Sequence, residues 1–174
     1  MYFGNLKLVD IADGPGVRVT LFISGCHLHC LGCQNSEAQS FTFGEEFTES
    51  TLITILKALE PAYISGFTLC GGEPFSIENQ KACAHILKEI KTKYPNKSIW
   101  AYSGYYLENI PQTDSTNDLL ANIDVLIEGP FILSLRDISD LNRWRGSTNQ
   151  RVLDIPETLK EKKKVYLKNI PNNS

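Results

Sequence analysis

Three cysteines lie close together in the first fifth of this 174-residue chain. Cys26, Cys30 and Cys33 follow the spacing C-x3-C-x2-C within the segment G-C-H-L-H-C-L-G-C-Q-N. These thiols can meet at one centre only if the backbone curls into a loop, because neither a helix nor a strand gathers all three side chains around one point. The spacing therefore predicts a loop that binds metal or does redox chemistry.

Two kinds of metal site are consistent with this loop. A structural zinc site takes four cysteine or histidine ligands, so the three thiols with His27 or His29 give a Cys3His interpretation. Each histidine is the sequence neighbour of a cysteine, which is unfavourable for completing a tetrahedron around the same ion. An iron–sulfur cluster is also held by cysteine thiolates, and three ligands leave one iron open to a small molecule with amine and carboxylate groups.

The elements beside the loop place it at the rim of a sheet. Residues 17–24 are rich in β-branched and aromatic side chains and predict a strand that runs directly into the cysteines. A second apolar strand at 66–70 ends at Gly71 and Gly72, whose missing side chains let the backbone approach a ligand closely. Parallel α/β sheets keep their active sites at this carboxyl end of the strands, so the position favours function.

The rest of the chain alternates between helices and strands. Its apolar spacing predicts helices at 49–60, 82–94 and 118–121, and strands at 98–102, 123–127 and 151–153. This alternation predicts an α/β fold with a mostly parallel sheet of right-handed β/α units. A closed eight-unit barrel needs about 250 residues, so we expect residues 1–174 to form one domain shaped as an incomplete, partial TIM-type barrel.

Composition restricts the class of protein. Hydrophobic residues make up 42% of the chain and charged residues 21%, and no apolar run approaches the roughly 18 residues of a membrane span. The formal net charge of -3 argues against a nucleic-acid partner, because nucleic-acid-binding surfaces are basic. Since no secretory signal is visible at the N-terminus, the chain is expected in the cytoplasm.

The sequence also predicts how three further side chains pack or pair. Disulfides are not expected in a reducing cytoplasm, and Cys70 and Cys83 stand in apolar surroundings where they should pack as small hydrophobic groups. Arg18 lies within an apolar strand, where a buried cation needs a partner. We expect a salt bridge to a carboxylate in preference to a direct role at a cofactor.

The cysteine spacing after a first strand, together with the sequence G-G-E-P at 71–74 after a second, resembles the radical S-adenosylmethionine superfamily. The resemblance implies a [4Fe-4S] cluster on Cys26, Cys30 and Cys33, with S-adenosylmethionine bound to the open iron through its amino and carboxylate groups. It also implies that one electron cleaves the sulfonium to methionine and a 5'-deoxyadenosyl radical, which then abstracts a hydrogen atom.

A narrower resemblance covers most of the chain, and the segments that carry it are residues 9–11, 14–18, 20–26, 100–105 and 144–150. They are similar to the anaerobic ribonucleoside-triphosphate reductase activating proteins, which implies a partner reductase that receives a glycyl radical. Flavodoxin or ferredoxin is the implied reductant, no membrane partner is expected, and a homodimer stays open. The alternative within this class is an activase of another glycyl radical enzyme, such as pyruvate formate-lyase.

The same resemblance assigns roles on the sheet rim. Gly71 and Gly72 receive the amino group of S-adenosylmethionine, and Glu73 either adds polarity there or braces the loop. Ser103 and Glu128 end the third and fourth predicted strands on the same rim. Their hydroxyl and carboxylate are expected either to reach the ribose or the methionine amine, or to face solvent as loop residues.

Further roles fall on the cysteine loop and on a late irregular segment. Gly32, Cys33 and Gln34 are expected to pass beside the adenine, with backbone groups reading its exocyclic amine. Gly32 replaces an aromatic residue common in the superfamily and allows this approach, while Gln34 replaces an aromatic residue found in many relatives. Trp144 and Arg145 are hypothesised to cover a lateral opening of the sheet or to receive the glycine loop of the reductase.

Overall fold

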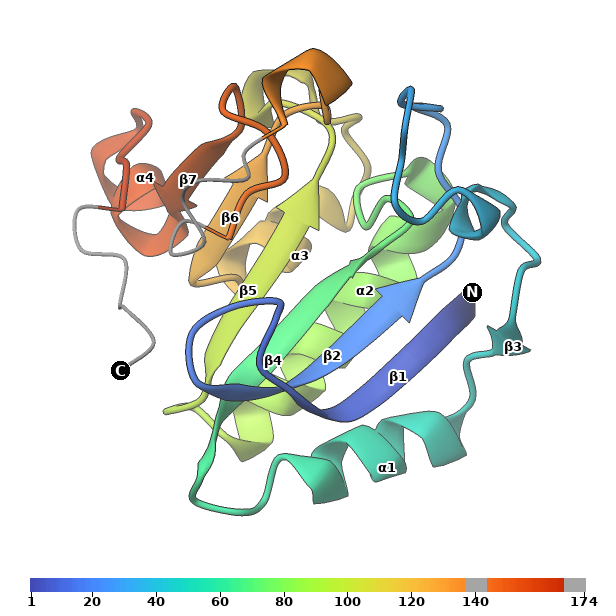
Figure 1. Cartoon of the computed structure of the whole chain (residues 1–174). Coiled ribbons are helices and arrows are strands. Elements are labelled where there is room, and N and C mark those ends of the chain that lie inside the picture. Colours follow the sequence, from blue (N-terminus) through green and yellow to red (C-terminus); the bar gives the residue numbers. More distant parts are fainter. Residues whose placement is uncertain (137–143, 168–174) are drawn as a thin grey trace.

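The computed structural model describes residues 1–136 and 144–167 and has an α/β fold. Its sheet has seven strands in the order β3-β1-β2-β4-β5-β6-β7 (Figure 1). The four central strands pair in parallel and are β2 (Val17–Ile23), β4 (Ile64–Gly71), β5 (Ser98–Ser103) and β6 (Val125–Glu128). The flanking strands pair antiparallel and are β1 (Tyr2–Asp10), β3 (Glu45–Glu46) and β7 (Arg151–Asp154).

The sheet is therefore mixed, which corrects the expectation of a mostly parallel one. Parallel neighbours need a crossover connection of a dozen or more residues, whereas antiparallel neighbours can be joined by a short turn. The connection between β1 and β2 spans only residues 11–16, so these two strands form a hairpin. The α/β class is confirmed, and the partial barrel stays a prediction.

Three helices cover one face of the sheet, namely α1 (Glu49–Ala58), α2 (Ile77–Lys93) and α3 (Thr116–Ala121) (Figure 1). Alternate strand residues point toward them, and Leu21, Leu69 and Ala101 are fully buried in this main core. These helices confirm the predicted ones, although α2 begins earlier than the pattern indicated. Within residues 1–136 and 144–167, no helix combines the length and apolar character needed to cross a membrane.

Three elements were not predicted from the sequence, and one of them, β3, has only two residues. Strand β1 carries Gly4 and Asn5, which are both poor strand formers, and its pairing with β2 and β3 holds it extended. Helix α4 (Ile155–Glu161) is short, and it begins where Oδ1 of Asp154 accepts a hydrogen bond from the Glu157 N–H at 3.0 Å. A capped helix of only seven residues gives little periodicity to detect.

The second face of the sheet contains Arg18, whose side chain is fully buried. Its Nε donates to Thr68 Oγ1 at 2.7 Å, and its Nη2 donates to the carbonyl oxygens of Phe67 (2.7 Å) and Ser98 (2.9 Å). Nη1 donates to Pro15 O at 3.2 Å and to Ser98 Oγ at 3.1 Å. These hydrogen bonds go to carbonyl and hydroxyl oxygens, so the expected salt bridge to a carboxylate was wrong. Burial lowers the pKa of Arg18 to about 10.

Arg18 also supports the turn at 11–16, which lies across this face (Figure 1). Thr68 Oγ1, the acceptor for Arg18, donates in turn to Asp13 O at 2.7 Å. Gly14 has a φ of 132°, and a Cβ there would lie 2.8 Å from Cδ of Arg18. The glycine is needed because the arginine occupies the space of a side chain.

Replacing Arg18 by methionine tests this assignment. We expect Arg18→Met to lower the free energy of unfolding by about 1–3 kcal/mol, because buried carbonyl and hydroxyl oxygens lose their donors. Urea unfolding followed by circular dichroism measures the change. The exposed Lys88→Met on α2 is the control and should be nearly neutral. Equal stability of the two variants would contradict the assignment.

Candidate metal centre

The three cysteines lie on the loop that follows β2 (Figure 1). Gly25 opens this loop with a φ of 98°, and a Cβ there would lie 2.1 Å from the ring of Phe41. The backbone then folds back on itself, because Gly25 N–H donates to Ala38 O (2.7 Å) and Cys26 N–H donates to Gln39 O (3.1 Å). All three loop cysteines are free thiols and partly exposed. The predicted ligand loop is thus a closed backbone structure with three partly exposed cysteines.

Several neighbouring groups act on the pKa of Cys26. Burial raises the pKa of Cys26, and the Leu28 N–H that donates to its Sγ at 3.5 Å lowers it. Negative charge on Glu73 raises that pKa further, as does charge on the other two loop thiols, Cys30 and Cys33. Without a cation, each thiolate therefore opposes the ionisation of Cys26. A bound metal reverses this, because a coordinating centre deprotonates its thiol ligands.

The donor set is suited to an iron–sulfur cluster, which is held by cysteine thiolates. His27 Nε2 instead hydrogen-bonds Glu78 Oε1 at 3.0 Å, and His29 Nδ1 hydrogen-bonds Gln39 Oε1 at 2.9 Å. Each histidine thus has a partner outside the thiol group, which the Cys3His zinc interpretation does not predict. In the described part of the chain, no three His, Cys, Asp or Glu side chains are placed to hold a single metal ion.

The double glycine after β4 packs directly against the cysteine loop. Gly72 N–H donates to Ile23 O at 2.7 Å, and Glu73 N–H donates to Gly25 O at 2.8 Å. A Cβ on Gly72 would lie 2.6 Å from Gly25 O, and Gly71 adopts a φ of 102°. From the sequence, these glycines were expected to admit a ligand. In the structure, the closest approach that Gly72 permits is to the backbone just before Cys26.

Glu73 is a buried carboxyl group beside this contact, with 1% of its surface exposed. Its Oε1 accepts hydrogen bonds from Ser103 Oγ and Phe75 N–H, both at 2.9 Å, and its Oε2 accepts one from Gly104 N–H at 2.7 Å. Burial raises the pKa of Glu73 to about 7, although these donors lower it. Of the two roles expected for Glu73, these hydrogen bonds correspond to the bracing role, because they join the end of β4 to the end of β5.

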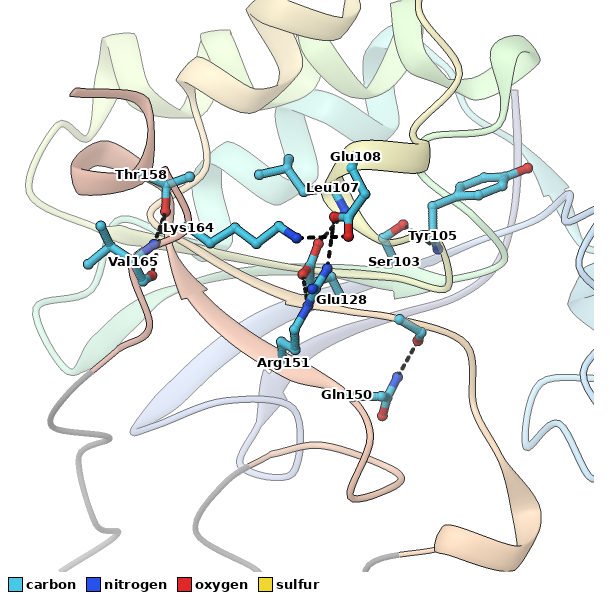
Figure 2. A network of polar contacts seen from close by, with 11 residues as sticks. Ser103, Tyr105, Leu107, Glu108, Glu128, Gln150, Arg151, Thr158, Lys164 and Val165 are labelled. Atoms are coloured by element: carbon cyan, nitrogen blue, oxygen red, sulfur yellow. Dashed lines mark hydrogen bonds and ion pairs between the residues drawn. The ribbon is translucent and has the colours of Figure 1, made fainter. Parts of the chain in front are cut away.

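Ser103 and Glu128 lie on one rim, as predicted, since they are direct partners in the pairing of β5 with β6. Both are buried, so the alternative of solvent-facing loop residues was wrong. The Glu128 carboxylate accepts a hydrogen bond from Leu107 N–H and forms an ion pair with Arg151 (Figure 2). Burial raises the pKa of Glu128.

Arg151 extends this contact into a network (Figure 2). It forms an ion pair with Glu108 Oε2 at 2.9 Å and lies over the ring of Tyr106 at 4.3 Å. Lys164 contacts the other oxygen of Glu108 at 2.7 Å, and these bonds lower the pKa of Glu108 to about 2. The network fixes β7 and the segment after α4 against the rim. The network was not predictable from the sequence, because its members are far apart along the chain and each is an ordinary surface residue type.

Gly32 and Gln34 take different positions on the loop. Gly32 has a φ of 72°, and a Cβ there would lie 3.1 Å from the side chain of Leu133. Gln34 is exposed and lines a hollow of about 490 Å³ together with Lys7 and Phe22. The adenine contacts expected of residues 32–34 stay predictions.

Trp144 lies against the second face of the sheet. It packs beside Trp100, Val125 and Ile127, and its carbonyl oxygen accepts a hydrogen bond from Tyr102 Oη at 2.7 Å. Whether the segment covers a lateral opening of the sheet or receives the glycine loop of the reductase stays a prediction. Residues 137–143, which precede it in the polar segment, lie outside the described residues.

Comparison with known proteins agrees with this geometry. Residues 12–153 match the family described as "4Fe-4S single cluster domain". The chain is 34% identical to the anaerobic ribonucleoside-triphosphate reductase-activating protein of Enterobacteria phage T4, over 87% of this chain and 93% of the relative. It is 38% identical to that of Vibrio cholerae over 82% and 90%, and 36% identical to that of Escherichia coli K12 over 83% and 92%.

The chain belongs to this family of activating proteins. The matched region of the 4Fe-4S domain contains the cysteine loop, the Gly71 to Glu73 edge, and the rim residues Ser103 and Glu128. Every residue proposed for cofactor contact from the sequence therefore lies within it.

One site residue of this family member was not singled out from sequence. Asn79, on the first turn of α2, is buried and donates from Nδ2 to the carbonyl oxygens of Ser24 (3.1 Å), Gly25 (3.2 Å) and Glu73 (3.1 Å). Its only sequence signal is a polar residue at a helix start, which is common at that position.

The raised pKa of Glu73 predicts a pH dependence of stability. The folded state holds this proton up to pH about 7, whereas the unfolded chain loses it near 4.5. The contribution is present in full below pH 4.5 and is lost as pH rises through 7, by about 3 kcal/mol. Urea unfolding between pH 5 and 8 should show this loss, and Glu73→Gln should remove it. The exposed Glu60→Gln should keep the wild-type slope, and an unchanged slope in Glu73→Gln would contradict the assignment.

Proposed function

We propose that this chain holds a [4Fe-4S] cluster on Cys26, Cys30 and Cys33, binds S-adenosylmethionine against it, and installs a glycyl radical on an anaerobic ribonucleoside-triphosphate reductase. The supporting observation is the loop of three free thiols packed against the backbone of the double-glycine edge. The relatives are named activating proteins of that reductase. Three thiol ligands also leave the open metal position that catalytic centres keep.

When bound, the cluster and S-adenosylmethionine supply a one-electron cleavage of the sulfonium to methionine and a 5'-deoxyadenosyl radical, as in the superfamily that the motifs resemble. The residues of the chain do the positioning. In this proposal the backbone at Gly71 and Gly72 takes the amino group, because this edge lies directly beside the cysteine loop. Glu73 holds that edge in place through Ser103 and Gly104.

Ser103 and Glu128 are the rim groups proposed to reach the ribose or the methionine amine. Ser103 Oγ now donates to Glu73, and Glu128 is engaged by Arg151. To contact a ligand, Ser103 would have to give up its hydrogen bond to Glu73, and Glu128 its ion pair with Arg151. Gly32, Cys33 and Gln34 remain our assignment for the adenine.

The proposal extends to the context of the reaction. Leu31, between Cys30 and Cys33, has 80% of its surface exposed, so a reducing protein such as flavodoxin or ferredoxin can approach the loop. A single domain over 1–174 shaped as a partial barrel and a cytoplasmic location complete the proposal.

Iron content is the first test. Anaerobic reconstitution with iron and sulfide should give a brown protein with about four irons per chain. Cys26→Ala should lose this iron and its absorbance, because the remaining two loop thiols are too few. Cys83→Ala is the matched control, since this thiol is buried in the core away from the loop, and it should retain the iron. A colourless protein with one tightly bound zinc would overturn the proposal.

The partner is tested by electron paramagnetic resonance. The reconstituted protein, a reductant, S-adenosylmethionine and the reductase from the same cell should together give a glycyl doublet, because the partner glycine loses a hydrogen atom. Pyruvate formate-lyase in place of the reductase should give none. Cofactor cleavage without a doublet on the reductase would mean that the chemistry is right and the partner is wrong.

A further inference from the structure

Asn79 makes contact with both segments that the proposed cofactor would touch. Its Nδ2 lies 3.1 Å from Ser24 O and 3.2 Å from Gly25 O, which directly precede Cys26. The same nitrogen lies 3.1 Å from Glu73 O, at the end of the double-glycine edge. One carboxamide therefore donates to carbonyl oxygens on both sides of the contact between loop and edge.

These carbonyl oxygens lie in the interior of the protein. Ser24 is fully buried, Glu73 is 1% exposed and Asn79 itself is 2% exposed. Buried carbonyl groups need hydrogen-bond donors, and a lost partner costs about 1–3 kcal/mol. Gly25 O receives Glu73 N–H as well, so the backbone bond and the carboxamide act on the same oxygen.

The position of Asn79 on α2 makes this contact rigid. The preceding turn is fixed by backbone bonds from Asn79 N–H and Gln80 N–H to Ser76 O, at 2.9 and 3.1 Å. The helix itself is anchored in the main core by Cys83 and Ile86. The carboxamide is thus held by a well-packed element and not by the loop that it contacts.

We propose that Asn79 is a positioning residue that fixes the spacing between the cysteine loop and the Gly71 to Glu73 edge, and through it the affinity for S-adenosylmethionine. This inference rests on the proposed function. A ligand that is held by an open iron on one side and by the edge on the other depends on the distance between them. Asn79 sets that distance without touching the ligand.

An aspartate at this position tests the idea with almost no change in shape. Asn79→Asp replaces the donor by a carboxylate oxygen that faces three carbonyl oxygens, so the loop and the edge are pushed apart. Asn79→Ser is the second variant, because it keeps a donor but shortens its reach.

Gln80 supplies a matched control on the same helix turn. Its Nε2 donates to Phe75 O (2.8 Å) and Pro111 O (2.7 Å), and its Oε1 accepts from Thr116 Oγ1 (2.6 Å). Gln80→Glu is therefore the same amide-to-carboxylate change in a buried site, but its partners are Phe75 and the segment near 111–116, and not the carbonyl oxygens of Ser24, Gly25 or Glu73. A loss of general stability should appear in both variants, whereas a loss of cofactor positioning should appear only in Asn79→Asp.

The experiment compares anaerobically reconstituted wild-type and variant chains. Iron content, thermal midpoint and the change in the electron paramagnetic resonance spectrum on titration with S-adenosylmethionine are measured. We expect Asn79→Asp to keep its iron and to bind S-adenosylmethionine at least 10-fold more weakly, Asn79→Ser about 3-fold, and Gln80→Glu less than 2-fold.

Each other outcome overturns the inference in a recognisable way. Wild-type affinity in Asn79→Asp, or an equal loss in Gln80→Glu, would show that Asn79 has no special effect on the cofactor. Loss of iron in both Asn79 variants would mean that the residue serves assembly of the cluster and not placement of the ligand. A wild-type chain that takes up no iron, or whose spectrum does not respond to S-adenosylmethionine, would instead refute the proposed function itself.

Discussion

The backbone contact between the end of β2 and the end of β4 is the constraint on which the site depends. The carbonyl oxygens of Ile23 and Gly25 accept the N–H groups of Gly72 and Glu73, and the parallel register places Ile23 opposite Gly71. A Cβ on Gly72 would occupy the place of the Gly25 carbonyl, so the two segments meet without side chains between them. The cysteines follow this contact on one side, and the bracing carboxylate follows it on the other.

Much of this arrangement could be predicted from local sequence. The β-branched run in β2, the apolar run in β4 and the glycines after it are strong patterns that do not depend on the rest of the chain. Because parallel strands end at a common edge, these patterns were sufficient to place the cysteine loop beside Gly71 and Gly72, and Ser103 beside Glu128. The residues that lie together on this rim could therefore be predicted from the sequence.

The rest depends on contacts that leave no local pattern. Arg18 was expected to find a carboxylate, but its partners include main-chain carbonyl oxygens, which every residue carries and no sequence reveals. Glu128 was placed correctly on the rim, yet its engagement by Arg151 follows from antiparallel pairing of β7 that the pattern of alternating elements did not indicate. Asn79 escaped notice because its hydrogen bonds also go to carbonyl oxygens of distant segments.

The same contact sets an order of events during folding. Strands β2 and β4 are parallel, so they can pair only after the intervening chain with α1 has crossed from the end of one to the start of the other. Such non-local contacts form slowly compared with helices and hairpins. On the ribosome, the three loop cysteines emerge well before Gly72 and Asn79, and for that interval their loop has no edge to pack against. The backbone that precedes Cys26 therefore gains its full set of hydrogen-bond partners only after β4 and the start of α2 have been translated.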